Sequence, residues 1–373
     1  MTANPKTSGQ PTVVVVGGGY GGTAVAKALD ETAAVVLVEP KEAFMHNIAA
    51  LRALVDPSWL ERIYLPYDRL LTNGRIVRDR AAVVEPGRVV TATGEEIAAD
   101  YVVLASGSSY PFPAKTAHVD TEAAFAQTHA AHAALAGADR VLLLGAGPVG
   151  IELAGEIRHV WPEKSITLLD PADDVLGGPF LPELKAELRR QLDEAGVQVL
   201  LGSPLQQPPP TEPGEVGTFT VTTEAGAEVT ADIWFRCYGV VPNSDFLGDG
   251  LRSARGADGF IDVLPTMQVA GHDTVFALGD LSNADAKMAA FAGRQAETVV
   301  ANITALIAGE NELVDYEPMG IGIAVPIGPE GGAGQFPGQD GIIGAEVVAE
   351  LKGRHMGVER FAEMLGLVVP VAD

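Results

Sequence analysis

Short apolar, β-branched runs alternate along this chain with longer stretches of helical spacing. The run Thr12–Val16 ends in the glycine-rich segment Gly17–Gly22, a helical pattern follows at Thr23–Leu29, and a second apolar run fills Val35–Val38. This order predicts a strand, a tight turn, a helix and a second strand parallel to the first. The N-terminal part of the chain is therefore predicted to form a βαβ unit.

The same order recurs later in the chain. An apolar run at Val141–Leu144 leads into Gly145–Gly150, a helical pattern at Ile151–His159, and another apolar run at Ile166–Leu169. A second βαβ unit is therefore predicted, and two such units favour an α/β fold with parallel sheets.

Further elements are predicted between and after the two units. Helices are predicted at Leu181–Ala195 and Met288–Ile307, and strands at Val83-Val84, Arg88–Thr91, Tyr101–Ala105, Val197–Leu201, Phe219–Thr223, Asp232–Cys237 and Thr274–Leu278. The Pro-rich stretch Pro204–Pro213 is expected to be an exposed connection.

The last sixty or so residues hold two apolar runs around a glycine-rich turn, Ile321–Pro326 and Gly331–Phe336, and then a helical tail. Met356, Phe361 and Met364 are spaced to lie loosely on one face of that tail. Such a face is more often core than a membrane contact, and a shallow membrane contact stays open as the alternative.

Composition narrows the function classes. The 373 residues carry a formal net charge of −24, which disfavours nucleic acid as a partner. The N-terminus lacks an apolar signal core, and no stretch approaches the ~18 consecutive apolar residues of a spanning helix. We expect a cytoplasmic protein of two or three domains, with contact at the inner face of the membrane and a homodimer left open.

The first glycine turn has the spacing of a dinucleotide site. Gly17, Gly19 and Gly22 match G-x-G-x-x-G, in which the first glycine permits the turn, the second admits a pyrophosphate and the third allows close helix–strand packing. The amides at the start of the following helix would bind the phosphates. Glu39, at the end of the second strand, can accept hydrogen bonds from ribose hydroxyls.

The second turn repeats the spacing with Gly145, Gly147 and Gly150, and Asp170 takes the acidic position. The Asp170 carboxylate should repel a 2′-phosphate, and residues 171–178 contain no arginine to receive one, so NADH is predicted over NADPH. Glu152 is expected on the first turn of the helix, either facing the nicotinamide or favouring the helix dipole.

Together these segments resemble the two-dinucleotide-domain flavoprotein reductases of the glutathione-reductase superfamily. Thr274–Asp280 resembles the late FAD motif of that family, Val103–Gly107 its Ala-Thr-Gly turn, and Cys237–Asn243 its second turn. The resemblance implies two Rossmann-like domains, with FAD in the first and a nicotinamide nucleotide in the second, and a small C-terminal α+β segment. It also implies that Asp280 bonds to the ribityl chain of FAD.

Within the superfamily, the chain is most similar to the ferroptosis-suppressor, or apoptosis-inducing-factor-2-like, NAD(P)H:quinone reductases. The segments that carry this similarity are Phe44–Arg52, Pro111–Pro113, Trp161–Lys164 and Lys287–Ala289. Animal members begin Met-Gly and are lipidated, whereas this chain begins Met-Thr, so anchoring by that route is not supported. Asp170 also departs from the animal pattern.

The resemblance predicts the domain boundaries and extends the set of site residues. The FAD domain would comprise 1–117 and 241–312, the NADH domain 118–240 and the C-terminal domain 313–373. The predicted cofactor-binding residues are Gly17, Gly19, Tyr20, Gly22, Glu39, Lys41, Arg52, Val83, Ala105, Ser106, Gly107, Gly145, Gly147, Pro148, Val149, Gly150, Asp170, Gly239, Gly279, Asp280 and Met288.

The lone cysteine, Cys237, excludes an internal redox disulfide, so electrons must pass directly from FAD to an acceptor. A quinone accepting two electrons also needs two protons, and His46, Lys287 and Lys352 are the candidates to supply them or to stabilise charge, with Glu152 as a further catalytic candidate. No metal site is predicted. The alternatives are a reductase of a small iron–sulfur carrier, a flavin-bearing redox-sensing interaction protein and a biosynthetic tailoring oxidase.

Overall fold

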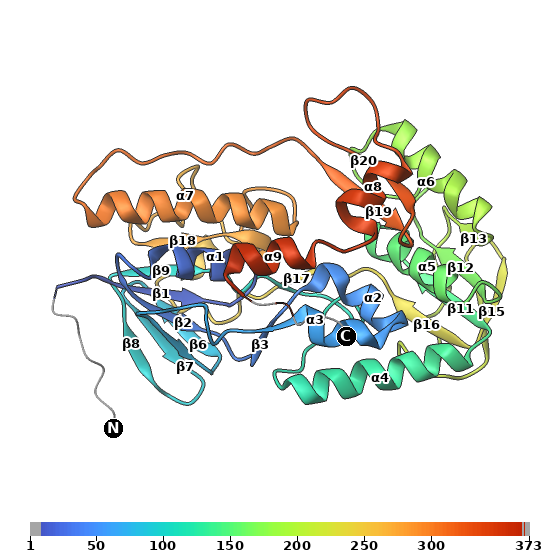
Figure 1. Cartoon of the computed structure of the whole chain (residues 1–373), viewed down its shortest axis with the longest axis horizontal. Coiled ribbons are helices and arrows are strands. Elements are labelled where there is room, and N and C mark those ends of the chain that lie inside the picture. The colour runs from blue at the N-terminus through green and yellow to red at the C-terminus, as the bar shows by residue number, and fades with distance from the viewer. Residues whose placement is uncertain (1–8, 368, 370–373) are drawn as a thin grey trace.

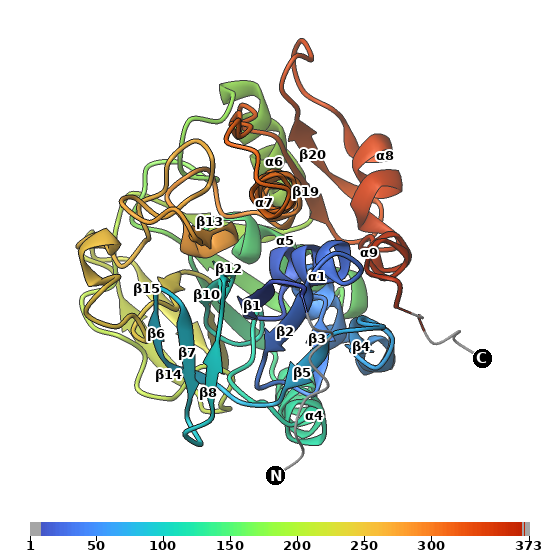
Figure 2. The same ribbon diagram turned by 90° about the vertical axis from the view of Figure 1, so that its left-hand side faces the viewer.

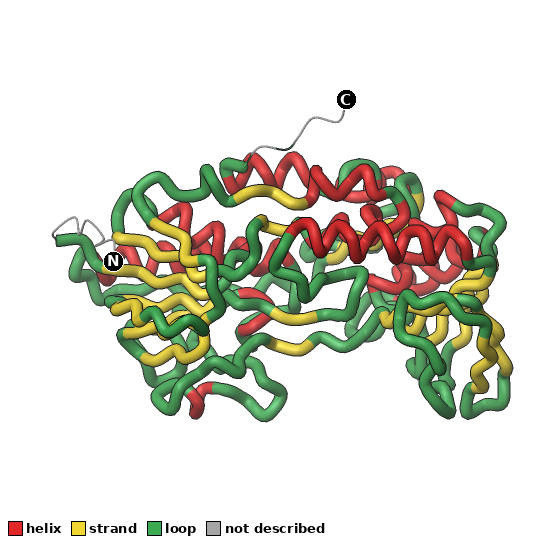
Figure 3. The backbone as a smooth tube through the Cα atoms, turned by 90° about the horizontal axis from the view of Figure 1, so that it is seen from below, coloured by secondary structure: helices red, strands yellow, loops and turns green. Residues whose placement is uncertain are grey.

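The fold was examined in a computed structural model, which describes residues 9–367 and residue 369. Two lobes lie side by side, and the C-terminal segment lies across both of them (Figure 1). Seen from below, many of the strands lie toward the two ends of the molecule, and shorter ones lie between them (Figure 3). The start of the chain, where the Met-Gly pattern was compared, lies outside the described residues.

The first lobe is built on a five-stranded parallel sheet in the order β18-β9-β1-β2-β5. Its strands are Val275–Ala277 (β18), Tyr101–Leu104 (β9), Thr12–Val16 (β1), Ala34–Val38 (β2) and Arg75–Val77 (β5). Helices Tyr20–Leu29 (α1) and Ala289–Ile307 (α7) lie on one face (Figure 2). An antiparallel sheet of Ala81–Glu85 (β6), Arg88–Thr91 (β7) and Glu96–Ala98 (β8) lies on the other.

Strand β1 shows how the sequence builds both faces of this sheet. Side chains alternate along a strand, so Val13 and Val15 pack beneath α1 and α7, and Val14 and Val16 pack toward β6–β8. All four valines are buried. Continuous β-branched runs are typical of parallel strands covered on both faces.

The second lobe repeats the plan with a four-stranded parallel sheet in the order β13-β12-β11-β16. Its strands are Val197–Leu200 (β13), Ser165–Leu169 (β12), Arg140–Leu144 (β11) and Ile233–Arg236 (β16). It also contains helices Thr121–Gly137 (α4), Pro148–Val160 (α5) and Pro182–Glu194 (α6), and the hairpin Phe219–Thr222 (β14) with Glu228–Ala231 (β15). The Pro-rich stretch lies in the connection between β13 and β14, as predicted.

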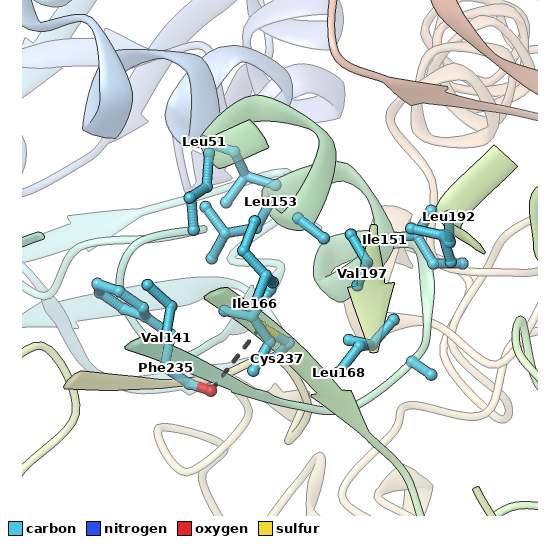
Figure 4. Packing of buried hydrophobic residues seen from close by; sticks show 14 of the residues in the cluster. Leu51, Val141, Ile151, Leu153, Ile166, Leu168, Leu192, Val197, Phe235 and Cys237 are labelled. Carbon is cyan, nitrogen blue, oxygen red and sulfur yellow. Dashed lines mark hydrogen bonds between the residues drawn. The ribbon is translucent and has the colours of Figure 1, made fainter. Parts of the chain in front are cut away.

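Short elements join the lobes. Ser108–Ser109 (β10) pairs antiparallel with Val241–Pro242 (β17), so the two chain segments that pass between the lobes are bonded to each other. Ala43–Met45 (β3), Tyr64–Pro66 (β4) and helices Ala50–Val55 (α2) and Leu60–Ile63 (α3) complete the first stretch of chain. Leu51 of α2 packs into the core of the second lobe, in one cluster of buried side chains with Leu153 and Val141 (Figure 4).

The C-terminal segment is a β-hairpin followed by helices. The predicted apolar runs form Ile323–Ile327 (β19) and Gly331–Gln335 (β20), and Ala345–Val348 (α8), a π-helical turn at Ala349–Gly353 and Val358–Leu365 (α9) follow. The hairpin lies on α5 and α6, and α9 lies on α1, where the rings of Phe361 and Tyr20 are 5.1 Å apart.

One expectation for this segment was wrong. Met356 does not share a helix face with Phe361, because it precedes α9 in a turn with φ of 52° and is buried. Gly357, the residue just before α9, has φ of 71°, a left-handed conformation that glycine adopts readily. The side chain of Met364 lies outside the described part of the structure.

Candidate functional site

The first glycine turn connects β1 to α1. At two of its three motif glycines there is no space for a Cβ atom, and at the third there is. A Cβ on Gly17 would lie 2.5 Å from the Ala105 carbonyl oxygen, and one on Gly22 would lie 1.9 Å from that of Gly17. A Cβ on Gly19 would meet nothing within 4 Å, and its φ of −79° suits any residue. The fold therefore needs glycine at 17 and 22 but does not need it at 19.

The second turn, between β11 and α5, shows the same pattern. A Cβ on Gly145 would lie 2.8 Å from the Cys237 carbonyl oxygen, one on Gly150 would lie 1.9 Å from that of Gly145, and one on Gly147 would meet nothing within 4 Å. Gly147 also has an ordinary φ of −76°. An open glycine at the start of a helix is what a pyrophosphate needs to reach the backbone amides, so both turns fit a dinucleotide.

Glu39 and Asp170, the carboxylates at the ends of β2 and β12, each accept two backbone hydrogen bonds, one of them from a glycine turn. Glu39 accepts hydrogen bonds from the Gly18 amide (2.6 Å) and the Lys41 amide (2.8 Å). Asp170 accepts them from the Ala146 amide (2.7 Å) and the Ala172 amide (2.8 Å). Each carboxylate oxygen can accept a second bond, so ribose hydroxyls could bind without breaking the turn.

A surface pocket of about 440 Å³ begins at Pro40, the residue after Glu39. It is lined by Pro40, Glu42, Arg78, Val119 and Asp120. The Arg78 guanidinium bonds the Lys41 carbonyl oxygen and lies 4.9 Å from the ring centre of Tyr67, whose hydroxyl donates to the Gly18 carbonyl. Burial lowers the pKa of Lys41. These contacts tie the pocket to the first glycine turn, where the adenosine half of FAD is expected.

Asp280 lies where β18 gives way to a short 3₁₀ turn at Gly279–Leu281. Its carboxylate accepts a hydrogen bond from the Ser108 hydroxyl at 2.6 Å. The same carboxylate forms an ion pair with Lys115 Nζ at 3.1 Å. Sequence reasoning missed Lys115. Two features of the sequence could have pointed to Lys115. It is the only Lys or Arg between Arg88 and Arg140, and it follows the family-like segment Pro111–Pro113 by two residues.

Asp280→Ala is expected to weaken FAD retention by about 10- to 100-fold, because a bond to a charged group contributes roughly 1.5–3 kcal/mol. The second lobe should stay folded, since the hydrogen-bond and ion-pair partners of the Asp280 carboxylate, Ser108 and Lys115, lie outside that lobe. The measurement is the FAD-to-protein ratio after gel filtration, with Asp249→Ala as the control, because the Asp249 side chain is 90% exposed and pairs with Arg252. Full FAD occupancy in Asp280→Ala would contradict the assignment.

His46 is fully buried, and both of its ring nitrogens are bonded. Nε2 is 2.8 Å from the Met356 carbonyl oxygen, which can only accept, so Nε2 carries the proton and Nδ1 accepts from the Tyr20 hydroxyl at 3.1 Å. Burial lowers the pKa of His46 to about 4 and raises that of Tyr20. At neutral pH His46 is therefore a neutral link between the first lobe and the C-terminal segment, and its predicted role in proton supply stays a prediction.

This buried neutral histidine predicts a pH-dependent stability. Because the pKa in the folded protein lies below the ordinary 6.5, the contribution is present above pH 6.5 and is lost as pH falls toward 4. Between pH 7.5 and 5 the free energy of unfolding should drop by about 2 kcal/mol more in the wild type than in His46→Gln. Urea unfolding with saturating FAD measures this. Parallel pH curves for the two proteins would contradict it, and the exposed His118→Gln should follow the wild type.

Asn47, beside His46, has a side-chain oxygen that is buried and has no hydrogen-bond partner among the described residues. A buried acceptor without a partner is costly, so it points to a donor that the protein itself does not supply. The Tyr20 hydroxyl accepts a hydrogen bond from the amide of the next residue, Ile48, at 3.4 Å, so Asn47 lies beside Tyr20. Asn47 was not among the predicted site residues, and its unpartnered oxygen adds it to the candidates for contact with a bound cofactor.

The remaining predicted residues of the first lobe are placed as follows. Ser106 and Asn243 bond each other twice, at 2.7 and 3.0 Å, across the two inter-lobe connections next to Gly107. Lys287 donates to the carbonyl oxygens of Ser282 (2.6 Å) and Asp285 (2.9 Å) just before Met288 and α7. Burial lowers the pKa of Lys287. Val83 is partly exposed on β6, and Ala105 and Gly279 follow β9 and β18.

Two predicted catalytic residues meet where the C-terminal segment lies on the second lobe. Lys352 Nζ, from the π-helical turn, lies 2.6 Å from a carboxylate oxygen of Glu152 on α5. Glu152 is the fifth residue of that helix, so it lies in the second turn and not in the first, where it was expected. The helix dipole acts mainly within the first turn, so a favourable interaction with the dipole is a weaker explanation for this carboxylate. Burial raises the pKa of Glu152, and Lys352 opposes that rise.

Arg52, predicted to bind the cofactor, instead faces the second lobe in this structure. Its guanidinium forms a buried ion pair with Glu156 of α5 and also donates to the Gly353 carbonyl oxygen at 2.8 Å. A direct contact between Arg52 and FAD stays a prediction.

Cys237 follows β16 and is buried among apolar side chains, including Ile166 and Leu168 (Figure 4). Burial raises the pKa of its thiol to about 12, so no thiolate forms at neutral pH. Within the described residues no group of three or more His, Cys, Asp or Glu side chains could hold a metal ion. In that same part of the chain, no helix is long and apolar enough to cross a membrane.

Comparison with known proteins assigns this geometry to a family. Residues 11–302 match the family model described as pyridine nucleotide-disulphide oxidoreductase. Ferroptosis suppressor protein 1 of Taeniopygia guttata is 32% identical over 377 residues, covering 99% of this chain and all of that protein. Apoptosis-inducing factor homolog B of Dictyostelium discoideum is 28% identical, covering 98% of this chain and 99% of that protein.

Solved structures share the fold. The sulfide:quinone oxidoreductase of Aquifex aeolicus aligns with a TM-score of 0.74 at 17% identity, covering 95% of this chain and 91% of that one. The water-forming NADH oxidase of Lactobacillus brevis, bound to NADH, aligns with a TM-score of 0.64 at 19% identity, covering 87% and 74%. The predicted two-dinucleotide-domain α/β fold is confirmed.

Proposed function

We propose, on the premise that this chain belongs to the pyridine nucleotide-disulphide oxidoreductase family, that it oxidises NADH and passes the electrons directly to a quinone. The family and the relatives make it an FAD-dependent NAD(P)H oxidoreductase. When bound, FAD supplies the redox chemistry by taking hydride from the nicotinamide and giving electrons to the acceptor. The choice of NADH and of a quinone is the proposal.

The observation that carries direct transfer is the state of the cysteine. The chain has one cysteine, Cys237, and burial holds its thiol protonated behind the second glycine turn. A dithiol carrier is therefore impossible, and the acceptor must itself reach the FAD site. The similarity to ferroptosis-suppressor-type reductases supports a quinone as that acceptor, and a fold shared with a sulfide:quinone oxidoreductase is compatible with it.

In this proposal, groups of the protein bind the two nucleotides, orient the nicotinamide and hold protons for the quinone. The amides of the two glycine turns and the helix N-termini of α1 and α5 would bind the pyrophosphates of FAD and NADH. Glu152 would accept a hydrogen bond from the nicotinamide carboxamide. Lys352 has ammonium protons beyond the one it gives to Glu152, and Lys287 has one beyond its two carbonyl partners, so both can stabilise negative charge or hold a proton for the quinone.

NADH should exceed NADPH in kcat/KM by about 100-fold or more, because a like-charge contact between Asp170 and a 2′-phosphate costs several kcal/mol. Asp170→Asn keeps an acceptor for the Ala146 amide but loses the charge, so the preference should shrink by about tenfold. Steady-state kinetics with both nucleotides measure this. Equal or better efficiency with NADPH in the wild type would contradict the proposed preference.

Anaerobic mixing of the FAD-loaded protein with NADH tests the whole proposal. We expect the flavin absorbance to bleach with NADH and to recover when a short-chain quinone is added. Bleaching without recovery would keep the reductase but refute the quinone as acceptor, and an iron–sulfur protein would be tried next. The absence of bleaching would refute the NADH oxidation and favour the redox-sensing alternative.

A further inference from the structure

Helix α5 presents two carboxylates to two other parts of the chain. Glu152 and Glu156 are four residues apart, so they lie one helical turn apart on the same face. Glu152 pairs with Lys352 of the C-terminal segment, and Glu156 pairs with Arg52 of α2. One helix face of the second lobe therefore binds a cation from the first lobe and a cation from the C-terminal segment.

The Arg52–Glu156 pair is the more buried of the two. Its side chains are 7% and 1% exposed, against 22% and 9% for Lys352 and Glu152. The pairing is two-pronged, with Nε and Nη2 of Arg52 each bonding one oxygen of Glu156. A guanidinium is suited to this because its donors are fixed in a planar fork.

Arg52 also bonds the residue next to Lys352. Its Nη2 donates to the Gly353 carbonyl oxygen at 2.8 Å, so the guanidinium joins α2, α5 and the π-helical turn. The backbone of the same turn packs closely against residue 329, because a Cβ on Gly353 would lie 2.4 Å from the Pro329 carbonyl oxygen. The backbone that carries Lys352 is thus fixed on two sides.

We propose that Arg52 and Glu156 form a positioning pair that holds the C-terminal segment on α5 so that the ammonium group of Lys352 lies against Glu152. A lysine has four side-chain torsions and loses considerable entropy when its end group is fixed, so the short contact depends on a fixed backbone. Arg52 and Glu156 act through Lys352, and their effect on hydride transfer rests on the proposed function.

The first test is independent of turnover. Arg52→Met with Glu156→Leu removes both charges while keeping volume, since such a replacement of a buried pair is tolerated better than loss of one partner. Hydrogen–deuterium exchange at residues 349–358 should become about tenfold faster or more in this double variant. Arg354→Met is the matched control, because Arg354 pairs with Glu330 at the surface of the same segment, and it should leave exchange unchanged. Unchanged exchange in the double variant would overturn the proposal.

The second test is a mutant cycle on the rate of flavin bleaching by NADH, corrected for bound FAD. The double variant should bleach about 10- to 100-fold more slowly, with a smaller change in the Kd for NADH. In a Lys352→Met background the same double change should have no further effect, whereas independent structural damage would add to the loss and overturn the proposal.

The two tests separate the two hypotheses. If NADH fails to bleach the wild type, the proposed function fails, and the exchange result alone decides the positioning pair. If the double variant loses FAD while its exchange at 349–358 is normal, Arg52 binds the cofactor and the positioning proposal is overturned.

Discussion

Gly147→Ala is expected to weaken NADH binding by about 10- to 100-fold and to leave FAD binding and the fold intact, apart from a helix N-cap cost of about 1 kcal/mol or less. In the protein alone a Cβ at this position would meet nothing within 4 Å, and the φ of −76° suits alanine. What the methyl group would displace is a phosphate approaching the amides at the start of α5. Titration of the FAD-loaded protein with NADH gives the Kd directly.

Two further glycine variants serve as controls. Gly150→Ala places a Cβ 1.9 Å from the Gly145 carbonyl oxygen, so it should destabilise the second lobe by about 3 kcal/mol or more. Gly19→Ala should lower FAD occupancy and spare the second lobe, because Gly19 has the same open geometry in the first turn. Normal NADH affinity in Gly147→Ala would mean that the second turn is not the nucleotide site.

Lys352→Met is expected to slow flavin reduction by NADH about 100-fold, equivalent to about 2.7 kcal/mol in the barrier. Glu152 is buried, which raises its pKa, and Lys352 is the nearby cation that opposes the rise. Without Lys352 the carboxyl group holds its proton to higher pH and loses the negative charge that, in the proposed function, accepts the hydrogen bond from the nicotinamide amide. The acid limb of the pH–rate profile should therefore move to higher pH.

Rapid-mixing absorbance at a series of pH values measures both effects. Arg360→Met removes an exposed cation of α9 in the same segment and should behave as the wild type. Lys352→Arg should recover part of the rate, because it restores a cation opposite Glu152. A Lys352→Met protein with a normal rate and an unmoved acid limb would remove Lys352 from the reaction.

The two nucleotide turns could be predicted from the sequence because their signals are local. The glycines, the preceding strand and the strand-end acid fall within about 30 residues in each unit. Spacing alone also indicated that Gly19 and Gly147 admit a ligand, and the open geometry of both agrees with that. The identity of FAD and the late motif at Asp280 came from the family resemblance.

The contacts between distant segments could not be read from the sequence. Arg52 and Glu156 are 104 positions apart, Lys115 and Asp280 are 165, and Glu152 and Lys352 are 200. Such pairs depend on how the two lobes and the C-terminal segment pack, which residue spacing does not encode. Local errors had a different cause: Gly357, the residue before α9, has a left-handed conformation, so a spacing that included Met356 could not describe one helix.

The place of β18 in the sequence also governs how the enzyme is assembled during synthesis. Strand β9 pairs with β18 at the edge of the first sheet, yet the whole second lobe is translated between Leu104 and Val275. At about 5–20 residues per second, the ribosome needs roughly 10–30 s to cover that interval. The second lobe can therefore fold while β9 still presents an unpaired edge, and that edge is a site for wrong pairing. The first sheet, and the turn after β18 that carries Asp280, can therefore be completed only after the ribosome has passed β18.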